Sequence, residues 1–179
     1  MIEIIRINSS HKHYQFIEEL MKTAFPHKER RDSLHQQKLV EQNSRFYNNI
    51  ILDNSTPIGI LTYWDLETFI FIEHFAIDYH YRNKGYGSKA LSNLLNHLQR
   101  PIILEAEKPT SELSSRRINF YKRQGFIVQD FPYLQPPYRE GDEWFPLLLM
   151  SYGFTDIEID YTNIRNSIYR EVYKKEATF

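Results

Sequence analysis

A short segment of the chain combines two glycines with two cationic side chains, in the order Arg82-Asn83-Lys84-Gly85-Tyr86-Gly87. A helix that begins here would present unpaired backbone N–H groups and a partial positive charge. Glycines let an anionic group approach those N–H groups with no Cβ in the way, and Arg82 and Lys84 add formal charge. A Gly-x-Gly pair alone is also typical of an ordinary turn, but the whole segment predicts a cradle for a pyrophosphate group.

An apolar strand and an amphipathic helix are predicted to flank this segment. Residues 69–77 are apolar except for Glu73 and His74, as in a buried strand. After the segment, four leucines recur at the spacing i, i+3, i+4 and i+7, beginning at Leu91. This spacing predicts a helix that buries one face. The cradle would therefore lie at a helix N-terminus that follows a strand.

The rest of the chain alternates between segments with the two-residue period of strands and segments with the 3.6-residue period of helices. We expect further strands at residues 3–7, 46–52, 58–64, 102–106, 126–131 and 143–152. We expect further helices that follow Ser9 or Ser10, span 33–43, run from Ser114 or Ser115 to Gln124, and span 162–174. Short turns between the strands at 46–77 predict an antiparallel meander. The expected fold is a mixed α/β sheet with an antiparallel N-terminal half and helices on both faces.

The arrangement Arg-x-x-Gly-x-Gly after a strand resembles the acyl-CoA signature of the GNAT superfamily of N-acetyltransferases. Residues 73–78 are similar to the strand that precedes this signature in the family. Residues 119–126 are similar to its later helix, which usually ends in Tyr-x-x-x-Gly-Phe. The resemblance implies the GNAT acyl-CoA N-acyltransferase fold over residues 1–152. Residues 153–179 would then be a helical extension, packed on this domain or on a partner subunit.

The resemblance also implies acetyl-CoA as the co-substrate. In the family, backbone N–H groups of the strand before the signature bind the acetyl carbonyl and the pantetheine arm. The implied cofactor-binding residues come from this strand, the cradle and the later helix: Phe75, Ala76, Ile77, Arg82, Asn83, Lys84, Gly85, Tyr86, Gly87, Ser88, Ser114 and Asn119. The family often has Asn at the position of Ser114, so the chain departs from the pattern there, and Asn119 is the alternative contact.

Tyr121 is the candidate general acid. A phenol has an ordinary pKa of about 10, comparable to that of a thiol leaving group, so it can donate a proton at neutral pH. The resemblance places a tyrosine at this position near the sulfur of coenzyme A. The competing interpretation is a core tyrosine in the last turn of its helix.

Glu73 is the candidate general base, because a carboxylate inside an apolar strand needs an explanation. Similar family positions carry Glu or His that accepts the proton of the amine, sometimes through water. Glu73 would otherwise anchor the substrate or form a salt bridge, and Glu105 or Glu107 on the next strand could replace it as the base. In the family the amine attacks directly in a ternary complex, which suits a chain without cysteine.

Two other functions compete with an acetyltransferase. One is a module that binds acyl-CoA without turnover. The other is an NAD-type domain, because Gly85-x-Gly87-x-x-Ala90 followed by Glu105 matches the dinucleotide fingerprint. That fingerprint requires the first glycine to follow its strand directly, whereas residues 78–84 intervene here. The preceding meander also differs from a doubly wound sheet.

The amino-acid composition limits which molecules the protein is expected to bind. The 22 basic and 23 acidic side chains leave a net charge of −1, which argues against a nucleic-acid surface. We expect neither a signal peptide nor a membrane helix, and therefore a cytoplasmic protein. No metal is expected, and the absence of cysteine excludes thiolate metal sites and an acyl-cysteine intermediate. The expected partners are a small-molecule or peptide amine, whose identity stays open, and a second copy of the chain in a possible homodimer.

A charged turn at residues 28–31 is open to two interpretations. Its basic side chains, Lys28, Arg30 and Arg31, could contact the 3′-phosphate of the cofactor. We favour a turn exposed to solvent, because charged side chains in a polar stretch are usually hydrated.

Overall fold

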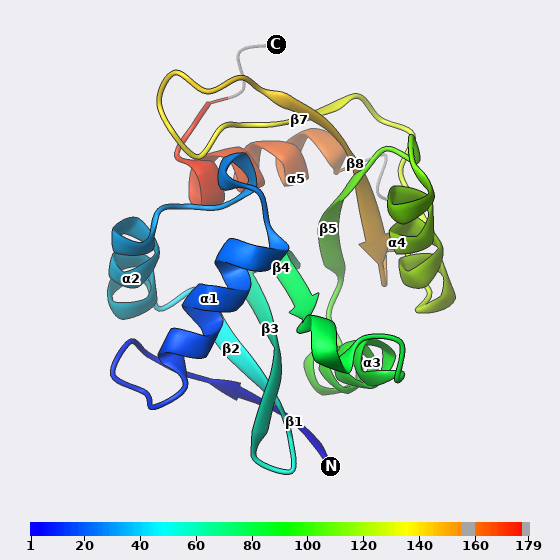
Figure 1. The fold of residues 1–179 in the computed structure, drawn as a ribbon. Helices are drawn as coiled ribbons and strands as arrows, with labels where there is room; N and C mark the ends of the chain where they lie inside the picture. The colour runs from blue at the N-terminus through cyan, green and yellow to red at the C-terminus, as the bar shows by residue number, and fades with distance from the viewer. Residues whose placement is uncertain (155–159, 177–179) are drawn as a thin grey trace. The chain divides into compact units, whose positions relative to one another are not determined.

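The computed structural model describes residues 1–154 and 160–176 and shows a mixed α/β protein whose strands pair mainly antiparallel, as expected (Figure 1). The chain forms two compact units, one of residues 1–65 and 72–99 and the other of residues 66–71 and the described residues from 100 onward. The first unit contains β1 (Ile2–Arg6), α1 (Tyr14–Ala24), α2 (Ser33–Gln42), β2 (Phe46–Asp53), β3 (Thr56–Asp65), most of β4 (Ile70–Ile77) and α3 (Tyr86–Leu98). The second contains β5 (Ile102–Glu107), α4 (Glu112–Arg123), β6 (Ile127–Val128), β7 (Tyr133–Gln135), β8 (Phe145–Tyr152) and α5 (Tyr161–Ile168).

The strands of the first unit confirm the predicted antiparallel meander. β1 pairs with β2, and β2 pairs with β3 in a register that sets Asn48 opposite Thr62. β4 is the next strand of the sheet after β3. At Gly59 of β3 an added Cβ would lie 2.6 Å from the carbonyl oxygen of Ala76, so only glycine fits where these two strands approach.

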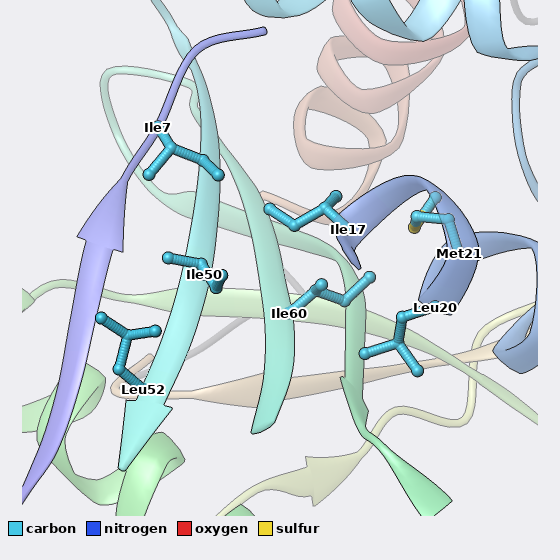
Figure 2. Packing of buried hydrophobic residues seen from close by; sticks show 7 residues of the cluster. All are labelled: Ile7, Ile17, Leu20, Met21, Ile50, Leu52 and Ile60. Atoms are coloured by element: carbon cyan, nitrogen blue, oxygen red, sulfur yellow. The ribbon is translucent and has the colours of Figure 1, made fainter. Parts of the chain in front are cut away.

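α1 covers one face of this meander, and Figure 1 shows it lying across β2 and β3. Ile17, Leu20 and Met21 recur at helical spacing and therefore point the same way. They pack on alternate residues of the strands, including Ile50 and Ile60, to form the hydrophobic core in Figure 2. The strand face turned away from α1 is buried too, because the intervening Ile51 is also fully covered.

The second unit is built around β8. β5 pairs antiparallel with β8. β6 and β7 also pair antiparallel with β8, β6 near its C-terminal end and β7 near its N-terminal end. α4 packs against β5 and β6. After α5 the chain continues as a π-helical turn over Tyr169–Tyr173, in which Tyr169, Val172 and Tyr173 are buried.

Several predicted boundaries were wrong. α1 begins at Tyr14 with no side-chain cap, so neither Ser9 nor Ser10 caps it. Ser111 caps α4 by accepting a hydrogen bond from the backbone N–H of Ser114, which makes Ser114 part of the helix. The strand expected at 126–131 is reduced to the two residues of β6, and β7 was not predicted. In the described part of the chain, no helix is both long and apolar enough to cross a membrane.

Candidate active site

The predicted cradle lies at the N-terminus of α3. Gly85 precedes the helix with φ +78°, a left-handed conformation that glycine adopts at little cost. Asn83 adopts the same conformation with φ +61°. Residues 82–85 are exposed, and no atom lies within 4 Å of the place that a Cβ at Gly85 would take, so the surface just before the first helical turn is open.

The cationic side chains of the cradle are held against its own backbone. Arg82 Nε donates to the carbonyl oxygen of Ile77 at 2.9 Å, and Lys84 Nζ donates to that of His80 at 3.0 Å. Arg82 thereby links the cradle to the end of β4. These contacts hold both positive charges against the backbone of the segment that precedes the cradle.

Tyr86 fixes the start of α3 to the turn between β2 and β3. Its hydroxyl donates to Asp53 Oδ2 at 2.9 Å, which raises the pKa of Tyr86 and lowers the pKa of Asp53. Tyr86 is the first residue of α3, so its backbone N–H has no acceptor within the helix. Gly87 and Ser88 follow in the same half-buried turn.

Glu73 lies in a buried ion pair. Its side chain is fully buried, with Arg31 Nη1 at 2.6 Å from Oε1 and the indole N–H of Trp64 donating to Oε2 at 3.0 Å. Burial raises the pKa of Glu73, but the charge of Arg31 and the hydrogen bonds from Arg31 and Trp64 outweigh it and leave the pKa below its ordinary value. Glu73 is therefore ionised at neutral pH.

His74 is buried beside the loop that carries Glu29 and Arg31. Its Nε2 lies 2.9 Å from the carbonyl oxygen of Glu29 and must carry the proton there, since a carbonyl only accepts. Nδ1 lies 3.3 Å from Thr62 Oγ1. Burial lowers the pKa of His74, so the imidazole is neutral. The expectation of a solvated turn at 28–31 was wrong for Arg31, because the loop carrying Glu29 and Arg31 is bound to β4.

Tyr121 lies in the last turn of α4, where its ring makes edge contacts with Phe120 and Phe126 at 5.1 and 5.7 Å. Burial raises its pKa to about 12, against a smaller opposing effect of Arg117. The phenol therefore keeps its proton at neutral pH. Within residues 1–154 and 160–176, no group hydrogen-bonds to its hydroxyl, which leaves the proton available to a ligand.

The carboxylates of β5 differ from each other. Glu107 forms an exposed ion pair with Arg117 at 2.9 Å. Glu105 is half-buried and accepts hydrogen bonds from the hydroxyls of Tyr133 and Tyr173. No pattern in the sequence indicated that Tyr173 is a neighbour of Glu105, since the two residues lie 68 positions apart.

The two implied cofactor residues of α4 have different surroundings. Ser114 is buried, and its Oγ accepts from the backbone N–H of Ser111 at 3.0 Å, completing the capping box. Its hydroxyl thus already serves the helix. Asn119 is exposed on the same helix. The role of either residue in binding a cofactor stays a prediction.

The first unit brings together the backbone of Phe75, Ala76 and Ile77, the cradle and Glu73. The second unit holds Tyr121, Ser114, Asn119 and Glu105. Sequence reasoning missed Arg31 and Trp64 as partners of Glu73, although a carboxylate within an apolar strand itself signals that a buried partner is needed. Over the residues that the structure describes, no three His, Asp or Glu side chains form a group able to hold a metal ion.

Comparisons with known proteins identify the family of the chain. The sequence model of the Acetyltransferase (GNAT) family matches residues 12–126, which include β4, the cradle and Tyr121. A curated relative from Bacillus subtilis (strain 168), "Putative acetyltransferase YjbC", is 28% identical over 105 residues. That match covers 57% of this chain and about half (52%) of the relative.

Solved structures share the fold. A "Putative acetyltransferase from GNAT family" from Bacteroides thetaiotaomicron is 44% identical, with a TM-score of 0.92 over 96% of this chain and 98% of that one. The ribosomal-protein-S18-alanine N-acetyltransferase of Escherichia coli has a TM-score of 0.58 at 16% identity, over 84% of this chain and 92% of that one. Arabidopsis thaliana NAA60 in complex with acetyl-CoA has a TM-score of 0.62 at 18% identity, over 85% and 98%. At such low identities the last two show the fold alone.

Proposed function

The chain belongs to the GNAT acetyltransferase family, and we propose that it transfers an acetyl group from acetyl-CoA to the primary amine of a small molecule or peptide. The observation that carries the proposal is the N-terminus of α3, which follows the exposed Gly85, where an added Cβ would meet no atom within 4 Å. Arg82 and Lys84 lie just before it in the chain. These residues fit a pyrophosphate, because they offer N–H donors and positive charge without an intervening Cβ.

We assign acetyl-CoA to β4 and the cradle. The residues proposed to hold it are the backbone of Phe75, Ala76 and Ile77, residues 82–88, and Ser114 or Asn119 from α4. Acetyl-CoA supplies an activated thioester carbonyl. Backbone N–H groups aligned on that carbonyl would stabilise the negative charge that develops on its oxygen during attack.

Transfer forms a bond from the amine nitrogen to the acetyl carbon and breaks the bond from that carbon to sulfur. We propose that Tyr121 donates its proton to the departing sulfur. A carboxylate or a water molecule takes the proton that the nitrogen loses. Glu73 is the first candidate for this base, and it needs a water relay or a shift of Arg31, since both its oxygens are hydrogen-bonded. Glu105 and Glu107 are the alternatives.

Tyr121→Phe tests the acid. The variant keeps the ring and its contacts with Phe120 and Phe126 but lacks the proton. We expect kcat to fall by about 10²-fold or more while the dissociation constant of acetyl-CoA stays unchanged. The assay is release of the coenzyme A thiol in the presence of a panel of amines and peptides.

Tyr152→Phe is the matched control, because Tyr152 packs on the same Phe126 at 5.5 Å but lies on β8. It should retain the wild-type kcat. Full activity of Tyr121→Phe, with chemistry shown to limit the wild-type rate, would disprove the acid assignment. Tight coenzyme A binding with no thiol release from any amine would favour the alternative function, a module that binds acyl-CoA without turnover.

A further inference from the structure

Glu105 is the centre of a cluster of aromatic side chains in the second unit. The hydroxyl of Tyr133 on β7 donates to Oε1 of Glu105, and the hydroxyl of Tyr173 donates to Oε2 at 2.7 Å. Gln135 Nε2 in turn donates to the Tyr173 hydroxyl at 3.0 Å. The carboxylate thus accepts hydrogen bonds from two phenols. Tyr133 precedes β8 in the sequence, and Tyr173 follows it.

Further rings surround these phenols. Tyr138 lies 5.0 Å from Tyr173, and Trp144 lies 5.3 Å from Tyr169, between ring centroids. We call the group of Glu105, Tyr133, Tyr138, Trp144, Tyr169 and Tyr173 the Glu105 cluster. Tyr133, Tyr169 and Tyr173 are buried and form its floor, whereas Glu105, Tyr138 and Trp144 are half-buried and give it a side that solvent reaches.

The cluster joins negative charge to aromatic rings. Burial, and then the charge of Glu105, raise the pKa of Tyr133 well above its ordinary value, and burial raises the pKa of Tyr169 to about 12. Tyr133 and Tyr169 therefore keep their protons at neutral pH. Aromatic faces attract cations, and a neighbouring guanidinium, that of Arg165, already lies 5.9 Å from the ring of Tyr169.

We infer that the Glu105 cluster binds a positively charged group of the acceptor, so that the preferred acceptor is an amine carrying a second cationic group. The reacting nitrogen must be neutral to attack, and the cation held by Glu105 is therefore a different nitrogen. The inference rests on the proposed function. β5, which carries Glu105, packs against α4, which carries Tyr121.

A matched series of acceptors tests the inference on the wild-type protein. Putrescine, butylamine and γ-aminobutyrate have similar length but carry a cation, a methyl group and a carboxylate at the far end. We expect kcat/KM for putrescine to exceed that for butylamine by about tenfold or more, and γ-aminobutyrate to be the poorest. Equal values for the three would overturn the inference and leave the proposed function standing.

Glu105→Gln and Glu112→Gln form the matched pair of variants. Glu105→Gln should raise KM for putrescine by about tenfold or more with little change in kcat, and should remove the preference over butylamine. Glu112→Gln should behave as wild type, because Glu112 is exposed in the first turn of α4 and belongs neither to the cluster nor to the proposed machinery. A fall in kcat with unchanged KM would assign Glu105 to proton transfer and would contradict the inference.

Two further measurements cover other outcomes. Tyr173→Phe keeps the ring but removes the hydrogen bond that orients the Glu105 carboxylate, and it should weaken the preference in the same direction if Glu105→Gln fails to fold. Calorimetry of putrescine and butylamine on the coenzyme A-bound protein needs no turnover. Tighter binding of putrescine without acetyl transfer would support the cluster and refute the proposed function, and equal binding would refute the cluster.

Discussion

Glu73 keeps its negative charge inside the first unit because Arg31 and Trp64 bind its two oxygens. Arg31 is itself only 11% exposed in its side chain, so neither charge is well hydrated. Removing one member of such a pair leaves the other buried and uncompensated. The pair also fixes the loop before α2 on β4, and His74 holds the same loop through the carbonyl of Glu29.

Glu73→Gln should therefore lower the free energy of unfolding by about 3–5 kcal/mol near neutral pH. Glu107→Gln, which breaks an exposed ion pair, should cost about 1 kcal/mol or less. Urea denaturation of both variants measures the difference. Similar small losses in the two variants would show that Arg31 finds water when Glu73 is neutral.

The pH dependence of that stability has a definite sign. The pKa of Glu73 is lowered in the folded state, since the charge of Arg31 and the hydrogen bonds outweigh burial. Its contribution is thus complete above the ordinary value of 4.5 and is lost as the pH falls through the lower folded value. The wild-type advantage over Glu73→Gln should shrink below about pH 4.5, and a constant difference down to pH 2 would contradict the assignment.

At this scale the sequence indicated which residues carry chemistry better than it indicated their partners. Glu73 stood out because it interrupts an apolar strand, and Tyr121 because of a helix ending that resembles the family. Arg31 is 42 positions from Glu73 and sits in a polar stretch that gives no local sign of burial. Only tertiary packing brings such pairs together.

Among the elements, α3 carries the proposed cofactor site. Gly87 lies in its first turn, so a β-branched side chain there would stand where a phosphate must approach. We expect Gly87→Val to weaken coenzyme A binding by about 100-fold or more while the fold persists. Asn96→Val is the control, since Asn96 is exposed near the other end of α3. Calorimetry of coenzyme A binding measures both, and equal affinities would mean that the pyrophosphate lies elsewhere.

Elements with a clear period were predictable, and elements set by tertiary contacts were not. The leucine spacing predicted α3, and the antiparallel meander followed from short turns between apolar runs. β7 has only three residues, Tyr133–Gln135, in a stretch rich in proline and tyrosine, so no period-two pattern marks it. It exists because β8 offers a pairing edge, and the hydroxyl of Tyr169 donates to its Leu134 carbonyl at 2.5 Å.

Across the whole molecule, residues beyond the family match complete the second unit. The match ends at residue 126, whereas β7, β8 and α5 follow it. The Bacteroides thetaiotaomicron structure aligns over 96% of this chain and so includes most of residues 153–179. Tyr161 and Tyr169 both donate to backbone carbonyls of the segment 132–134. The division into a domain at 1–152 and a helical extension stays a prediction, although α5 and the turn after it are hydrogen-bonded to the segment that contains β7.

Ligand-linked stability tests the cofactor class on the intact protein. A ligand that binds only the folded state at about 100 times its dissociation constant adds about 2.7 kcal/mol to the unfolding free energy. For a chain of this length that corresponds to a rise in Tm of about 5–10 °C. We expect coenzyme A and acetyl-CoA to give this rise, and NADH and ATP a much smaller one, because the cradle follows a polar loop rather than the end of a strand. Gly87→Val should abolish the rise for coenzyme A and leave the ligand-free Tm nearly unchanged. An equal response to NADH, abolished by the same variant, would assign the cradle to a dinucleotide instead.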